Sequence, residues 1–224
     1  MTAVTTPDRA LPGRTDATPA AAPAAPLALP SGERPTPARV LPDRTRALGV
    51  YLFMVADAMV LAAIVAAYFA VKDGSSAWPP KGVGVGTYIP FVVTITLTMA
   101  AAAAHWAVKA IRANDQRNVG IALLFTAFLG LAAANAEWAA FDKAGFGVGD
   151  HAYGTFYYVF LGYHLLHLVT ALALILLLAG RSVAGHFSAE HHDPLRSGIL
   201  YFQYSNAVWY TVATVLFVFS RVNG

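Results

Sequence analysis

A small set of polar side chains interrupts the long apolar runs of this 224-residue chain, and their types limit the chemistry that is possible there. They are two carboxylic acids, two histidines and two amides: Asp57, Glu137, His164, His167, Gln203 and Asn206. Carboxyl and imidazole groups can exchange protons or bind metal ions, whereas amides mainly form hydrogen bonds. Because cysteine is absent, disulfides, thiolate metal sites and cysteine nucleophiles are excluded.

The runs that carry these residues are long enough to cross a bilayer. A helix needs roughly 20 apolar residues to span a hydrocarbon core about 30 Å thick, and 57% of the chain is hydrophobic against 12% charged. Backbone groups in lipid must be satisfied within the segment, and the runs lack the alternation of barrel strands. The sequence therefore predicts an all-α polytopic membrane protein with five transmembrane helices over about 49–71, 87–111, 119–141, 156–180 and 197–220.

The first 46 residues differ from the rest, because Pro, Ala and Thr dominate and no sustained apolar run is present. Such a segment cannot offset its ordering entropy by burial, so we expect a disordered cytoplasmic tail over 1–46 before a transmembrane domain over 47–224. Lys and Arg are more frequent in the loops on the N-terminal side, which predicts a cytoplasmic N-terminus and an external C-terminus. The net charge of +3 arises in these loops, so a nucleic-acid partner is not expected.

Three of the polar residues fall at the same depth in the expected bundle. At about 1.5 Å per residue, Asp57 lies roughly 13 Å from the inner end of its span. His167 and Asn206 reach nearly the same level, while His164 and Gln203 lie one helical turn from them. We therefore expect an interhelical cluster of Asp57, His167 and Asn206, flanked by His164 and Gln203.

The expected cluster has three interpretations. Interhelical polar contacts contribute about 0.6 kcal/mol on average and can simply hold helices together. A buried carboxyl could instead tune a neighbouring proton pathway, because burial favours the protonated acid. His164, His167 and Asp57 could also bind a metal ion, but nothing in the sequence requires one, so no metal site is predicted.

Other polar and aromatic residues are expected at the membrane surface or in loops. Glu137 lies about one turn from the outer end of its span, so it either reaches the surface or pairs with a neighbouring helix. The tract from His186 to His192 fits a solvated loop better than a metal site. The residues predicted to contact lipid or a partner are Trp78, Trp138, Arg181, His186, His191, His192 and Arg196.

Six short motifs resemble, in order, those of subunit III of the haem-copper oxidases of the cytochrome c oxidase type. They are Leu52-Phe53-Met54-Val55-Ala56-Asp57, Trp78-Pro79-Pro80, Glu137-Trp138, Tyr153-Gly154-Thr155 with Gly162-Tyr163-His164-Leu165-Leu166-His167, His186-Phe187 with His191-His192, and Tyr201-Phe202-Gln203-Tyr204-Ser205-Asn206-Ala207-Val208-Trp209. Longer members of that family have seven helices. This chain corresponds to the last five, as in shorter bacterial versions.

The resemblance implies a non-catalytic integral subunit of a respiratory terminal oxidase in the bacterial plasma membrane. Such a subunit packs against catalytic subunit I in a complex that includes subunit II, binds phospholipid, and supports proton uptake and stability during turnover. Haem and copper are then expected on partner subunits and none on this chain, and a respiratory supercomplex is a further candidate partner. An accessory subunit of a nitric oxide reductase is the alternative within this resemblance; outside it stand a membrane metal enzyme and a small transporter.

The chain departs from the family motifs at four positions where the family has polar residues. One is Ala134, where the family has Gln three residues before the Glu of the third span. Asp57 stands where the family has Glu, Gln203 where it has His, and Asn206 where it has Asp. These three residues preserve hydrogen bonding better than they preserve proton exchange.

Overall fold

The computed structural model describes residues 2–3, 43–190 and 192–222, with only the backbone for 43–47 and 221–222. The chain divides into two units, Met1–Val40 and Leu41–Gly224, and all described helices lie in the second. They are α1 (Asp43–Asp73), α2 (Tyr88–Arg112), α3 (Gln116–Asp142), α4 (Ala152–Val183), α5 (Asp193–Ala213), the π-helical turn η1 (Thr214–Val218) and α6 (Phe219–Val222). Most of the expected tail, and His191, lie outside the described residues.

Four of these helices are long and apolar enough to cross a membrane. They are α2, α3, α4 and the Leu48–Asp73 part of α1. Helix α5 is not among them, because its 21 residues include Asp193, Arg196 and Asn206, and η1 separates it from the apolar residues that follow. The all-α membrane architecture is confirmed, whereas the fifth span stays a prediction.

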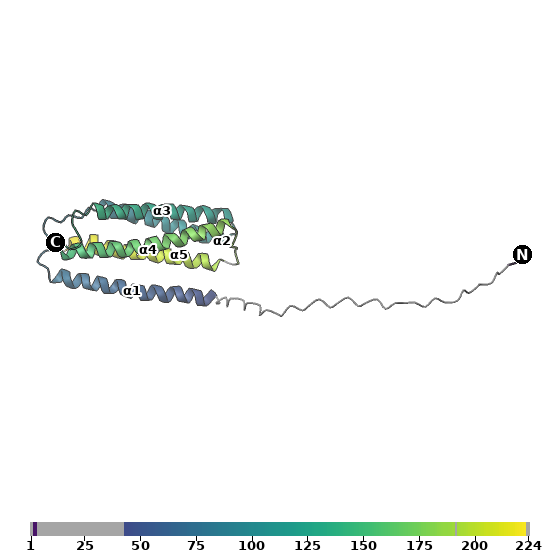
Figure 1. Ribbon diagram of the computed structural model, residues 1–224, viewed down its shortest axis with the longest axis horizontal. Helices are drawn as coiled ribbons and strands as arrows, with labels where there is room; N and C mark the ends of the chain where they lie inside the picture. The colour runs from purple at the N-terminus through teal and green to yellow at the C-terminus, as the bar shows by residue number, and fades with distance from the viewer. Residues whose placement is uncertain (1, 4–42, 191, 223–224) are drawn as a thin grey trace, which may run out of the picture. The chain divides into compact units, whose positions relative to one another are not determined.

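Helices α2 to α5 form a four-helix bundle in which each helix packs on two others. Helix α2 packs on α3, α3 on α4, α4 on α5, and α5 closes the ring against α2. Successive helices run in opposite directions (Figure 1). We call the end where α1, α3 and α5 begin the proximal end, and the opposite end the distal end.

Small residues let the bundle helices approach closely. Helix α2 carries buried alanines at a spacing of three and four residues: Ala100, Ala103, Ala104, Ala107 and Ala110. On α3, a Cβ atom added to Gly130 would lie 2.6 Å from Leu172 Cδ2 of α4, so only glycine fits without a shift. Such small-residue seams are typical of membrane helices, where close van der Waals packing drives association.

Helix α1 lies at the edge of the bundle, where it packs mainly against α5. Only 6% of its most apolar 18-residue window is buried, against 33% for α2 and 44% for both α3 and α4. Near its distal end, Tyr68 is fully buried and accepts a hydrogen bond of 2.8 Å from the Trp78 indole. Most of α1 thus presents an apolar surface outward, and a few side chains fix it to the bundle.

Candidate functional site

Asp57 links α1 to the bundle at mid-span. Its Oδ2 atom lies 3.0 Å from His167 Nε2 of α4 and accepts a hydrogen bond of 2.6 Å from the Tyr204 hydroxyl of α5. The Tyr163 hydroxyl also donates to the main-chain oxygen of Asp57, at 3.2 Å. The side chains of Asp57 and His167 are only 14% and 6% exposed. We call Asp57, His167 and Tyr204 the mid-span cluster.

The hydrogen bonds of His167 assign a proton to the mid-span cluster. His167 Nδ1 lies 2.8 Å from the Tyr163 carbonyl oxygen, and because a carbonyl only accepts, Nδ1 carries a hydrogen. A neutral ring would then leave Nε2 as an acceptor. The short contact between Nε2 and Asp57 therefore needs one more proton, on either residue. The pair can therefore exist as an ion pair or as a neutral acid and base.

A second carboxyl–imidazole pair lies inside the four-helix bundle. His164 Nδ1 is 2.8 Å from one carboxyl oxygen of Glu137 and 3.0 Å from the other, and neither side chain is exposed. The Trp209 ring of α5 lies beside the imidazole, with 5.0 Å between ring centroids. Of the two expectations for Glu137, pairing with a neighbouring helix is therefore the one the structure shows. This pair joins α3 to α4.

The expectation of one five-residue cluster is only partly right. Asp57 and His167 meet, but His164 pairs with Glu137, and Gln203 Nε2 donates to the Ala101 carbonyl of α2 at 2.9 Å. Asn206 is buried, and its amide atoms form no hydrogen bond within the described residues. The reason is rotation about the helix axis. Because a helix has 3.6 residues per turn, residues two apart are rotated by about 200° and lie on nearly opposite faces. Because Tyr204 faces α1, Asn206 faces away from it.

Tyr163 and Tyr204 are functional candidates that the sequence prediction missed. Tyr204 lies roughly 10 Å into the expected fifth span, at nearly the depth that selected Asn206. The same depth argument could have identified it.

The predicted lipid or interface residues have different environments. Trp138 is 68% exposed near the distal end, as expected, but Trp78 is 5% exposed and lies among the rings of Tyr68, Tyr153 and Phe156. Trp78 was expected to contact lipid or a partner; in the structure its N–H donates to the Tyr68 hydroxyl inside the protein.

The residues predicted at the proximal end lie in or near loops. The Arg181 guanidinium lies 5.4 Å from the centroid of the Phe187 ring. His186 and Arg196 are exposed and His192 is half-buried. Within the described part of the chain, no three His, Cys, Asp or Glu side chains gather as a metal site would need.

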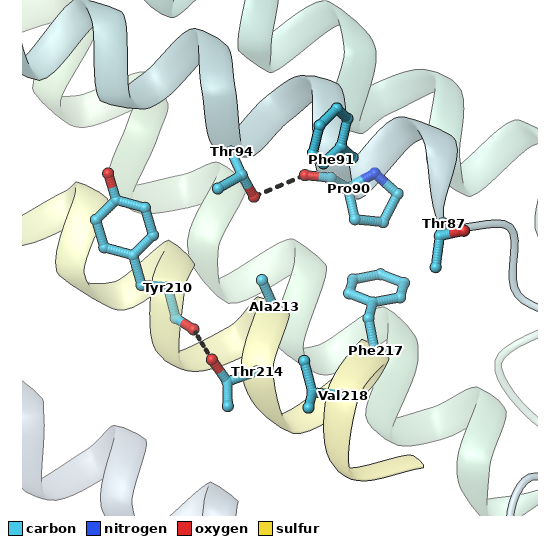
Figure 2. A pocket seen from close by; sticks show the side chains of 9 residues that line it. All are labelled: Thr87, Pro90, Phe91, Thr94, Tyr210, Ala213, Thr214, Phe217 and Val218. Atoms are coloured by element: carbon cyan, nitrogen blue, oxygen red, sulfur yellow. Dashed lines mark hydrogen bonds between the residues drawn. The ribbon is translucent and has the colours of Figure 1, made fainter. Parts of the chain in front are cut away.

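A groove of about 560 Å³ lies between the start of α2 and the end of α5 with η1 (Figure 2). Its lining residues are Thr87, Pro90, Phe91, Thr94, Tyr210, Ala213, Thr214, Phe217 and Val218. The Thr94 and Thr214 hydroxyls donate to main-chain oxygens of their own helical segments, at 2.7 Å each. The groove therefore presents an apolar surface. Such a surface suits an acyl chain or a packed helix better than it suits a catalytic site.

Fold and site together define an integral membrane protein of α-helices in which two carboxyls, those of Asp57 and Glu137, pair with histidines of a neighbouring helix. Residues 42–221 match the family model described as cytochrome c oxidase subunit III, so the chain belongs to this family.

Relatives named cytochrome c oxidase subunit 3 occur in bacteria and plants. The protein of Thermostichus vulcanus is 25% identical over 79% of this chain and 88% of its own length. That of Synechocystis is 29% identical over 77% and 75%. That of the plant Marchantia polymorpha is 30% identical over 72% of this chain, which spans 63% of the plant protein. This chain thus covers 88% and 75% of the two bacterial relatives, which agrees with the expectation of a short, five-helix form.

Proposed function

We propose that this chain is the subunit III of a respiratory haem-copper oxidase in a bacterial plasma membrane, where it packs on catalytic subunit I in a complex with subunit II. Haem and copper belong to the partner subunits in this proposal, and phospholipid is the ligand of this chain. The observation that carries the proposal is the small buried fraction of α1, 6% of its apolar window. A helix so little covered by its own chain offers a surface for a partner subunit.

Within that complex, the mid-span cluster is the candidate for a role in proton uptake. Support comes from the proton that Asp57 and His167 must share. We expect Asp57→Asn to leave the complex assembled and to lower its rate of proton uptake. Loss of assembly would instead mean that the carboxyl serves helix packing.

The proposal also includes α5, η1 and α6 as a fifth span, with the proximal end in the cytoplasm. Together these segments cover 30 residues, from Asp193 to Val222, enough for a hydrocarbon core about 30 Å thick at 1.5 Å per residue. The Lys and Arg residues at the proximal end agree with the positive-inside rule. Cysteine accessibility at each loop tests this orientation cleanly, because the chain has no cysteine of its own.

The experiment that tests the proposed function is extraction of a tagged chain in mild detergent, followed by native mass spectrometry and a haem spectrum. We expect two larger subunits with haem and copper and an oxygen-reducing activity in the same fraction. Nitric oxide reduction without oxygen reduction would favour the alternative, an accessory subunit of a nitric oxide reductase. A colourless chain without partner subunits would contradict both.

A further inference from the structure

A cavity of about 500 Å³ lies at the proximal end between α1, α2 and α5. Lys109 and Arg112 of α2 line it one helical turn apart, together with Arg196 of α5 and Tyr51 of α1. The other polar lining residues are His105, Asp193, Ser197 and Gln203. Gln203, at the deeper side, hydrogen-bonds the Ala101 carbonyl of α2 at 2.9 Å. This bond ties the α2 and α5 walls together, so the positions of the cations follow from the packing of the two helices.

The cavity lining has an excess of positive charge. Lys109, Arg112 and Arg196 face a single lining carboxylate, Asp193. None of the three cations forms an ion pair with a carboxylate among the described residues. Like charges one turn apart on a helix repel each other, so an anion bound among them would relieve the repulsion. Guanidinium groups in particular bind phosphate oxygens through paired hydrogen bonds.

The cavity also has an apolar side, and it lies at the level of lipid headgroups. Val108 and Ile199 line it below the cations. Lys109 and Arg112 occupy the last turn of α2, a helix of 25 residues, which at 1.5 Å per residue exceeds the hydrocarbon core of about 30 Å. Toward the distal end, exposed apolar side chains continue the surface on α1 and α2, among them Leu52 at 61%, Phe53 at 52% and Met99 at 50%.

We propose that this cavity binds the headgroup phosphate of an anionic phospholipid through Lys109, Arg112 and Arg196, with the acyl chains along α1 and α2. The inference rests on the lipid-binding part of the proposed function and assigns it a site. A free phosphate ion would leave the apolar side uncovered. A zwitterionic choline lipid would bring a further positive charge next to three cations. An anionic diacyl lipid matches both halves of the lining.

The test is native mass spectrometry of the complex extracted in mild detergent and supplied with phosphatidylglycerol, phosphatidylcholine or inorganic phosphate. We expect one phosphatidylglycerol to stay bound under activation that removes phosphatidylcholine. Arg196→Gln should weaken this binding about tenfold, since it removes one charge-assisted contact, and the triple variant K109Q/R112Q/R196Q should abolish it. Arg117→Gln is the matched control, because it removes a proximal cation outside the cavity and should leave binding unchanged. Lys143→Gln, which removes a cation at the distal end of α3, should also leave it unchanged.

Three results would overturn the proposal: equal retention of the two lipids, equal loss in the control variants, or displacement of the lipid by inorganic phosphate. If the triple variant does not accumulate, the three single substitutions decide, and unchanged binding in all of them refutes the site. The same spectra report the partner subunits separately. Specific lipid retention without haem-containing partners would refute the proposed function but not the lipid site. Haem-containing partners without specific lipid retention would refute the lipid site but not the proposed function.

Discussion

At the residue scale, two buried carboxyls are each bound by one histidine, but they join different parts of the protein. Glu137 and His164 lie within the four-helix bundle and are fully covered, whereas Asp57 and His167 connect α1 to it and keep a small exposed fraction. A carboxylate or a protonated histidine that is buried without a partner destabilises the fold. The inner pair therefore suits a structural role within the bundle, while the outer pair fixes α1 to it.

Asp57→Asn and Asp57→Leu should separate hydrogen bonding from charge in the docking of α1. Both contacts use the same carboxyl oxygen, Oδ2. An amide NH2 in its place can donate one hydrogen to His167 Nε2 and the other to the Tyr204 hydroxyl oxygen, so we expect Asn to preserve docking. Leucine removes both contacts, worth about 0.6 kcal/mol each, and should reduce docking about fivefold to tenfold. Crosslinking by a short bifunctional thiol reagent in the Phe53→Cys, Tyr201→Cys background reports it, because these two rings lie 6.1 Å apart across α1 and α5. Equal effects of Asn and Leu would contradict the hydrogen-bond account.

His164→Leu should destabilise the bundle by roughly 3 kcal/mol, since it leaves the Glu137 carboxyl buried without its partner. Replacing both residues by leucine should cost less than the sum of the single substitutions, because no buried carboxyl then remains. Unfolding in denaturing detergent, monitored by tryptophan fluorescence, measures the free energy of unfolding of all four proteins of this double-mutant cycle. Additive effects would show that the two side chains do not interact.

At the element scale, the bundle and α1 are held by different means. Alanines and Gly130 allow α2, α3 and α4 to pack closely, whereas α1 depends on Asp57 and Tyr68 and on ring contacts such as Phe53 with Tyr201. Close packing resists separation along the whole helix, and point contacts do not. Helix α1 is therefore the element whose position a partner subunit can most readily influence.

Gly130→Ile should destabilise the bundle by about 1–3 kcal/mol, as overpacking of a filled interface does. The added side chain would meet Leu172, whose Cδ2 already lies 2.6 Å from the position of a Cβ atom, and Phe202 beyond it. Gly120→Ile on the same helix is the control, because a Cβ atom there meets nothing within 4 Å. The unfolding assay should separate the two variants, and equal stability would show that α3 and α4 can move apart at no cost.

Depth along a helix could be predicted from the sequence, but rotation about its axis could not. Depth is proportional to residue number, so Asp57 and His167 were correctly matched across two spans. Rotation depends on which helices are neighbours, so Asn206 was assigned to the wrong face and Tyr204 was missed. Helix α1 also begins at Asp43, before the expected span near residue 49, because an apolar run marks the part in lipid and not the whole helix.

At the scale of the whole molecule, the described helices leave one side of the protein poorly covered. Helices α1 and α3 lie at opposite edges of the bundle (Figure 1). Both carry exposed apolar side chains, yet α1 is far less buried than α3, with 6% against 44% of the apolar window. In a membrane, lipid can cover either face. If a partner subunit covers one of them, the α1 side is the one we expect.

A photoreactive amino acid at Met59 should therefore crosslink to the catalytic subunit in native membranes, whereas the same group at Phe128 should not. The two sites are matched: their side chains are 69% and 66% exposed, and both lie about 17 Å from the proximal ends of their spans at 1.5 Å per residue. They differ in the helix that carries them, α1 or α3. Gel electrophoresis and mass spectrometry of the products identify the partner. A crosslink from Phe128 alone would place the interface on α3, and lipid adducts at both sites would mean that neither face binds a subunit.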